Sequence, residues 1–207
     1  MTTTNSQRIG IWVIAVVMVV GTIGSFFIVV VANQNQATDQ QKAIGQQAEY
    51  QKQIEEYQQK LGEQAKQLSD KYYKQFAPYE KQAKKFNAKD AKKLTTVDLK
   101  TGTGEVMKSD TEYGAYYVGW LPSGEIFDSS IDGGALKTPV TSDVQLIEGW
   151  TKGIQGMKIG GIREITIPSA QAYGEQGSGK IQPNTPIKFV IMMFPKPAQI
   201  PTPQISN

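Results

Sequence analysis

The chain has 207 residues, no cysteine, no histidine and a net charge of +3 at pH 7. These absences exclude disulfides, zinc clusters of the Cys/His type and catalytic triads that use imidazole as the base. A metal site made of carboxylates alone stays open, but no EF-hand spacing is present, and we expect no cofactor. Lysine is in excess over residues 33–94, whereas residues 95–207 are slightly acidic. An acidic domain fits phosphate backbones poorly, so we expect no nucleic-acid partner.

An uncharged, apolar run covers residues 9–32, after a short N-terminal tail of residues 1–8. As a helix rising about 1.5 Å per residue, it exceeds the hydrocarbon thickness of a bilayer, about 30 Å. We predict a transmembrane signal-anchor helix, which makes the membrane a partner through residues 9–32. The alternative is a cleaved signal peptide, because Val30, Val31 and Ala32 are small, although such peptides have a shorter apolar region.

The charges that flank this run predict its orientation. Arg8 precedes it, and residues 33–41 carry Asp39 alone. By the positive-inside rule, the N-terminus is cytoplasmic and all that follows Asn33 is extracytoplasmic. We therefore predict a single-pass membrane protein.

Residues 33–94 are rich in Gln, Lys, Glu and Ala and predict a helical stalk. Its apolar stripe repeats every 11 residues and consists of Tyr50, Ile54, Tyr57, Leu61, Ala65, Leu68, Tyr72, Phe76 and Tyr79. An 11-residue repeat favours a straight or slightly right-handed coiled coil, hence a homo-oligomer. The equal alternative is a lone helix whose stripe lies on the membrane or folds back. Pro78 is expected to break the helix near Phe76.

Lysines dominate residues 71–93. We favour a solvated helix face for this run. Attraction to anionic lipid headgroups or to an anionic wall polymer is the functional alternative.

Residues 95–194 combine strand-like segments with one glycine-rich helix. Strands are expected at residues 113–121, 161–167 and 186–194. Residues 126–130 lead into a loop at 131–143, and a second loop covers 170–184. The tail, residues 195–207, is Pro-rich and is expected to be disordered or to form polyproline II. We expect the fragment from Thr95 onward to fold alone.

The predicted helix covers residues 145–157, where Leu146, Trp150, Ile154 and Met157 form one apolar stripe. Its three glycines lower helix propensity, so packing must hold it, and they let other backbone approach closely. These features predict an α+β fold in which an antiparallel sheet curls around one short helix. Trp150 would fill the concave face.

Six short motifs follow one another over residues 117–184: YVG at 117, GEIFDSS at 124, LIEGW at 146, ITIP at 165, AYG at 172 and PN at 183. In order and spacing they resemble the FKBP-type peptidyl-prolyl cis-trans isomerases, over about residues 94–194. The resemblance implies a cofactor-independent isomerase, or rotamase, whose partners are proline-containing unfolded or nascent polypeptides.

That reaction suits a chain without cysteine or histidine. An X–Pro bond rotates over a barrier of about 18–20 kcal/mol, which is set by amide resonance. Catalysis needs no nucleophile; it needs an apolar cleft that grips proline and favours the twisted amide.

The resemblance also implies the site. The pocket floor is Trp150, and the remaining substrate-binding residues are Tyr117, Phe127, Leu146, Ile147, Ile181 and Phe189. Two residues have catalytic roles: the Tyr173 hydroxyl donates to a substrate carbonyl, and Asp128 is a buried carboxylate that orients the pocket. The alternative for each aromatic residue is ordinary core packing. Asp128 would need a polar partner if buried.

Three departures from the family pattern concern the rim of the cleft. Leu136, Lys137 and Pro139 stand where the family places an aromatic residue. Lys180 stands beside Ile181 in place of an apolar residue, and Gln182 replaces a proline. The loop from Gly174 to Asn184 is also one residue shorter than in small single-domain members. These changes open one wall of the cleft. We expect them to weaken macrolide binding more than isomerase activity.

We therefore predict a membrane-tethered isomerase that assists the folding of extracytoplasmic chains. One alternative is a non-catalytic proline-peptide-binding or chaperone module on a coiled-coil stalk. Another is a structural surface protein in which the coiled coil is the working part.

Overall fold

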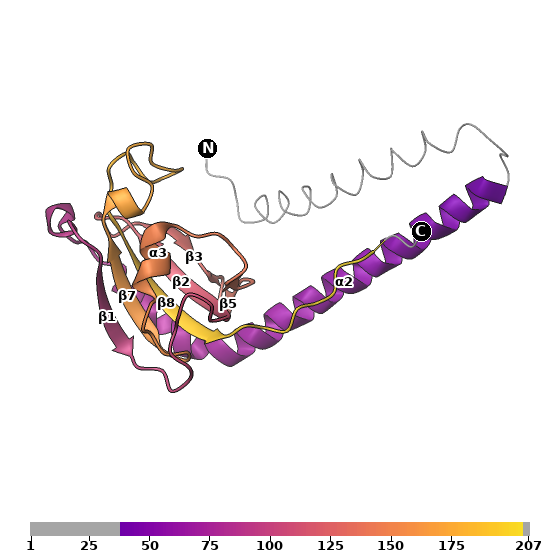
Figure 1. The fold of residues 1–207 in the computed structure, drawn as a ribbon, viewed down its shortest axis with the longest axis horizontal. Coiled ribbons are helices and arrows are strands. Elements are labelled where there is room, and N and C mark those ends of the chain that lie inside the picture. The colour runs from indigo at the N-terminus through magenta and orange to yellow at the C-terminus, as the bar shows by residue number, and fades with distance from the viewer. Residues whose placement is uncertain (1–37, 205–207) are drawn as a thin grey trace. The chain divides into compact units, whose positions relative to one another are not determined.

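The computed structural model describes residues 38–204 (Figure 1). Residues 61–199 form one compact unit, and residues 38–60 with 200–204 belong to a second. The N-terminal tail and the predicted transmembrane helix at residues 9–32 lie outside the described residues. Between residues 38 and 204, no helix is both long and apolar enough to cross a membrane.

The elements, in chain order, are α2 (Thr38–Phe76), η2 (Ala77–Gln82), η3 (Ala88–Asp90), β1 (Thr95–Lys100), β2 (Tyr113–Trp120), β3 (Ile126–Ser129), β4 (Ile131–Asp132), β5 (Ala135–Leu136), β6 (Val140–Thr141), α3 (Glu148–Gly153), β7 (Ile162–Ile167), η4 (Ser169–Gln171) and β8 (Ile187–Pro195).

The main sheet has the order β1-β7-β8-β2-β3, with β6 added to the start of β2. All of these pairings are antiparallel. The predicted antiparallel sheet with one short helix is therefore confirmed. The expected loop at residues 131–143 differs, because β4, β5 and β6 form short pairings within it.

Helix α3 is shorter than the 13 residues its stripe suggested, because it spans only Glu148–Gly153. The stripe is nevertheless buried: Trp150 is 3% exposed, and Ile154 and Met157 are 2% exposed. A Cβ at Gly153 would lie 2.7 Å from the Ile165 side chain, and one at Gly149 would overlap that of Ile167. Gly149 and Gly153 therefore let α3 lie directly on side chains of β7, whereas the sequence predicted the close approach of other backbone.

The central strands β2, β7 and β8 are buried on both faces, because alternate side chains contribute to different cores. The core on the α3 side contains Trp150, Ile165 and Phe189. The core on the opposite side contains Tyr116, Trp120, Val190, Met192 and Phe194.

The C-terminal part of α2 and the segment after it cover this opposite face. Phe76 is fully buried there, and Tyr72 stacks on Phe194 with ring centroids 4.6 Å apart. The Trp120 indole Nε1 donates to the carbonyl of Lys84 at 3.1 Å. Helix α2 ends at Phe76, and Pro78 is the second residue of η2, so the break predicted at Pro78 is confirmed.

The unit therefore begins at Leu61, which differs from the boundary at Thr95 expected from the sequence. The physical reason is the apolar second face of the sheet, which needs a cover that residues 95–194 do not supply. Four residues of the 11-residue stripe provide or join that cover: Leu68, Tyr72, Phe76 and Tyr79. They are used within the chain itself, whereas the stalk prediction assigned them to a coiled coil.

The tail was expected to be disordered or to form polyproline II, and two hydrogen bonds hold its described part. Gln64 Nε2 donates to the carbonyl of Ala198 at 2.7 Å. The backbone N–H of Gln204 donates to Gln53 Oε1 at 3.3 Å. Side chains of α2 therefore hold residues 198–204, although these residues form no helix or strand.

Candidate active site

Four aromatic rings from three strands and α3 meet on the α3 side of the sheet. Tyr117 from β2 and Phe189 from β8 lie edge-on to Trp150, with centroids 5.5 Å and 5.3 Å from it. Phe127 from β3 meets Phe189 in the same manner at 5.5 Å. Edge-to-face contacts satisfy the ring quadrupoles, so this cluster is held by geometry as well as by burial.

Gly119 on β2 makes room for two of these rings. A Cβ at this position would lie 2.5 Å from Phe189 Cε1 and 2.7 Å from Phe127 Cζ. Any other residue would displace one ring, which explains the glycine within an otherwise apolar strand.

The predicted apolar site residues all belong to this one cluster. Three are almost wholly buried, namely Trp150, Ile181 and Phe189 at 3%, 5% and 4% exposure. The others are partly buried and pack against them: Tyr117, Phe127, Leu146 and Ile147. Tyr173, predicted to be catalytic, also packs against this cluster. The pattern is that of a buried floor with partly exposed walls, so these side chains are both core and lining.

Asp128 lies at the rim of the cluster and not within it. Its side chain is exposed, so the expectation of a buried carboxylate is wrong. The reason is its place on β3, the last strand of the sheet. The Tyr117 hydroxyl donates to Asp128 Oδ2 at 2.5 Å, and the backbone N–H of Ser129 donates to Oδ1 at 2.8 Å. Both carboxylate oxygens are thereby fixed.

The sequence did not indicate the pair of Tyr117 with Asp128, because Tyr117 was assigned as an apolar wall. The pairing of Gly119 with Asp128 between β2 and β3 brings the two side chains together. Residues two apart on a strand share a face, so Tyr117 is the diagonal neighbour of Asp128.

The two tyrosines of the cluster act as hydroxyl donors at neutral pH. Burial, followed by the hydrogen bond to Asp128 and its charge, raises the pKa of Tyr117 well above its usual value. Burial, followed by the charge of Asp128, raises the pKa of Tyr173. Both hydroxyls therefore keep their protons.

The loop after β7 carries Tyr173 and Ile181. It is closed by reciprocal backbone hydrogen bonds between Ser178 and Ile181, at 2.9 Å and 2.8 Å, and by a bond from Asn184 to the carbonyl of Gly174. These bonds direct Ile181 into the core and leave Tyr173 half-buried. The loop is thus ordered by its own backbone.

Arg163 on β7 is a positioning residue that sequence reasoning missed. It is 7% exposed and donates from Nη1 to the carbonyls of Gly153 and Gln155, at 3.0 Å and 2.9 Å. Its Nε and Nη2 donate to the Asp98 carboxylate on β1, at 2.6 Å and 3.1 Å. These bonds satisfy carbonyls at the end of α3 and fix the helix that carries Trp150. A lone arginine inside an apolar strand was the available signal.

Leu136, Lys137 and Lys180, which depart from the family pattern, have definite places in the structure. Leu136 is 5% exposed and packs in the core on the opposite face, so it does not fill the missing wall. Lys137 Nζ donates to the carbonyl of Ser129 at 2.7 Å. Lys180 pairs with Glu125 at 3.2 Å, with both side chains exposed. No group of three acidic side chains that could hold a metal ion occurs in the part of the chain described here.

Residues 103–194 match the family model described as FKBP-type peptidyl-prolyl cis-trans isomerase. An "FK506-binding protein" of Neisseria meningitidis serogroup A is 42% identical over 90 residues, which is 44% of this chain and 83% of that protein. A "Probable FKBP-type peptidyl-prolyl cis-trans isomerase" of Haemophilus influenzae is 36% identical over 132 residues, 61% of this chain and 50% of that protein. A crystal structure of a peptidyl-prolyl cis-trans isomerase from Pseudomonas syringae is 34% identical and covers 49% of this chain and 73% of that one, with a TM-score of 0.42.

Proposed function

Since this chain belongs to the FKBP-type peptidyl-prolyl cis-trans isomerases and shares their activity, we propose that it is a membrane-tethered foldase for extracytoplasmic chains. Its substrates are X–Pro bonds of unfolded or nascent proteins. The apolar residues 9–32 support the tether, and Arg8 before them supports an extracytoplasmic domain.

The observation that carries the catalytic part is the aromatic cluster with a fixed carboxylate at its rim. In this proposal the proline ring rests on Trp150 between Tyr117 and Phe189, in a surrounding that excludes water. The Tyr173 hydroxyl donates to a backbone carbonyl of the substrate and holds the chain in register.

Asp128 supplies the discrimination between planar and twisted amides. Loss of amide resonance reduces the negative charge on the carbonyl oxygen. A fixed carboxylate nearby therefore destabilises the planar amide more than the twisted one, which lowers the barrier. Tyr117 and Ser129 hold that carboxylate in place.

We expect Asp128→Ala and Tyr173→Phe to slow catalysed isomerisation and leave the fold intact. Asp128→Ala removes a fixed carboxylate at the rim of the cleft, and Tyr173→Phe removes a half-buried hydroxyl. We expect each loss to cost about 1–3 kcal/mol in the transition state, hence roughly five- to 150-fold in rate. The measurement is the cis–trans exchange rate of a proline peptide by NMR, with circular dichroism as the check of folding. Asp110→Ala, an exposed carboxylate outside the cluster, is the control and should keep full activity. Full activity in both site variants would refute the proposed roles.

The tether and its orientation need a separate test. The chain has no cysteine, so Asp110→Cys in the full chain provides a single reactive thiol. We expect the protein to sediment with membranes and to react with a membrane-impermeant maleimide in intact cells. If the thiol reacts only after lysis, the domain lies on the cytoplasmic side and the predicted orientation is wrong. A soluble chain of full length would exclude the anchor.

A further inference from the structure

The C-terminal tail has a three-residue pattern of burial. Pro197, Ile200 and Pro203 are partly buried, and the residues between them are exposed. Polyproline II has three residues per turn, so these three side chains lie along one side of such a segment. The prolines in the tail favour that conformation. The tail therefore presents one apolar edge.

The side chains on α2 that bind the tail match this edge in spacing. Gln53 and Gln64, which bind Gln204 and Ala198, stand 11 residues apart and so share one azimuth on the helix. Eleven helical residues rise about 16 Å, and six residues of polyproline II rise about 19 Å. The lengths of helix and of tail between the two contacts are therefore nearly equal.

The contacts use backbone groups that polyproline II leaves free. This conformation has no internal hydrogen bonds, so its backbone N–H and carbonyl groups are available to bind other side chains. The glutamine amides supply one acceptor and one donor, at 3.3 Å and 2.7 Å. Beside them on the helix lie Tyr50, Ile54, Tyr57 and Leu61 of the 11-residue stripe, each partly buried.

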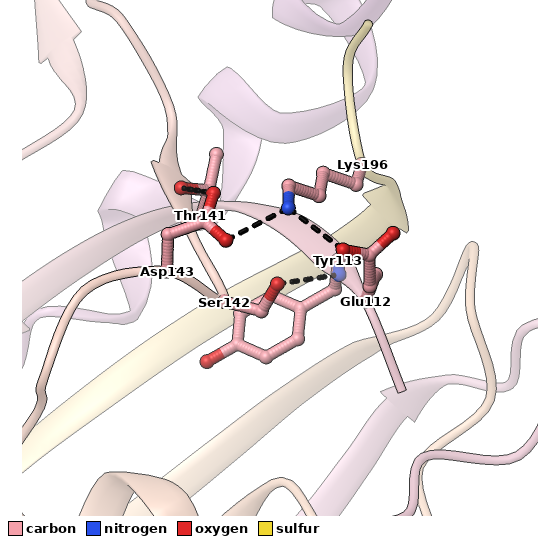
Figure 2. Close-up of polar contacts among 6 residues, drawn as sticks. All are labelled: Glu112, Tyr113, Thr141, Ser142, Asp143 and Lys196. Atoms are coloured by element: carbon pink, nitrogen blue, oxygen red, sulfur yellow. Dashed lines mark hydrogen bonds and ion pairs between the residues drawn. The ribbon is translucent and has the colours of Figure 1, made fainter. Parts of the chain in front are cut away.

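Two ion pairs of Lys196 hold the first residue of the tail after β8 (Figure 2). Lys196 Nζ lies 2.8 Å from Glu112 Oε1 and 2.8 Å from Asp143 Oδ1, and the lysine side chain is 19% exposed. The hydrogen bond from Lys196 lowers the pKa of the Asp143 carboxyl, and that bond also raises the pKa of Lys196. The backbone N–H of Ser142, the neighbour of Asp143, donates to the carbonyl of Tyr113 at the start of β2. The tail therefore leaves β8 in a fixed direction.

We infer that residues 196–204 are an intramolecular strap that occupies the face of α2 which would otherwise pair with a second copy of this chain. Gln53, which binds the tail, lies beside the stripe from Tyr50 to Leu61, so a second copy that paired through this stripe would compete with the strap. The helical segment is monomeric while the strap is bound and self-associates when it is removed. This inference does not depend on the proposed substrate or on catalysis.

The first test places the strap in the full chain, purified in detergent. The chain has no cysteine, so Gln53→Cys with Gln204→Cys gives one defined pair for a short bismaleimide. We expect an intrachain crosslink, detected by mass spectrometry of the tryptic peptides. In the matched control, Glu55→Cys replaces Gln53→Cys on the opposite side of the helix, and little crosslink is expected. Equal yields from the two pairs would overturn the strap.

The second test measures self-association of the full chain and of a chain that ends at Lys196. We expect the shortened chain to associate with a dissociation constant at least about tenfold lower, by sedimentation equilibrium in the same detergent. Tyr50→Glu with Tyr57→Glu in the shortened chain should return it to the behaviour of the full chain. A shortened chain that associates no more than the full chain would overturn the inference. So would association that the two glutamates leave unchanged.

Discussion

A fragment that begins at Thr95 should be far less stable than one that begins at Leu61. The shorter fragment lacks Phe76, Tyr72 and the rest of the cover on the second face of the sheet. Loss of a single buried phenylalanine side chain costs about 3–5 kcal/mol, and a whole domain is stable by about 5–15 kcal/mol. We expect the Thr95 fragment to be largely unfolded, or to retain secondary structure without fixed packing, at 25 °C.

Urea unfolding of the two fragments, followed by tryptophan fluorescence, measures this difference. Phe76→Ala in the Leu61 fragment isolates one side chain of the cover. It should lower the free energy of unfolding by about 3–5 kcal/mol and leave a cooperative transition. If the Thr95 fragment unfolds at the same urea concentration as the longer one, the segment from Leu61 to Leu94 contributes nothing to the domain.

Trp150→Ala should remove both stability and activity. The indole is 3% exposed and meets two other rings edge-on, so its loss leaves a large cavity under the cleft. The expected cost is about 3–5 kcal/mol in the free energy of unfolding. Isomerisation by the molecules that remain folded should be nearly lost, because the surface that receives proline is gone.

Trp120 provides the matched control for this prediction. It is 1% exposed in the same sheet, but it belongs to the core on the opposite face. Trp120→Ala should cost a similar free energy of unfolding, whereas each folded molecule should keep its isomerase activity. Comparison of the two variants at a temperature where both are folded separates packing from catalysis. Equal loss of activity per folded molecule in both would show that Trp150 acts only through stability.

The sequence predicted the central strands β2, β7 and β8, because they are rich in apolar residues, but it did not indicate the edge strands β1 and β3. Residues 189–194 form a continuous apolar run, which indicates a buried strand. The same run cannot show what covers each face, because its alternate residues belong to different cores. The same ambiguity applies to the apolar stripe on α2, whose partner the sequence does not identify. Periodicity shows that a face is apolar, but it does not distinguish a second copy from the chain's own sheet and tail.

The apolar site residues could be predicted because the resemblance fixed their identities, and the fold brings them to one face. The exposure and hydrogen bonds of the polar site residues could not be predicted. The exposure of Asp128 depends on the position of β3 at the edge, and its bond to Tyr117 depends on the register with β2. Arg163 acts through carbonyl groups of α3, which carry no side-chain signal in a sequence.

The bonds of Arg163 have a consequence for the order in which the protein folds. Helix α3 has only six residues, far too few to persist in water without support. Its support comes from Arg163 on β7 and, through the same guanidinium, from Asp98 on β1, which lies 65 positions away in sequence. Contacts over such separations form late, because the loop between them must close first. The floor of the cleft is therefore completed only after β1 and β7 have paired, and catalytic competence should appear in the final phase of refolding.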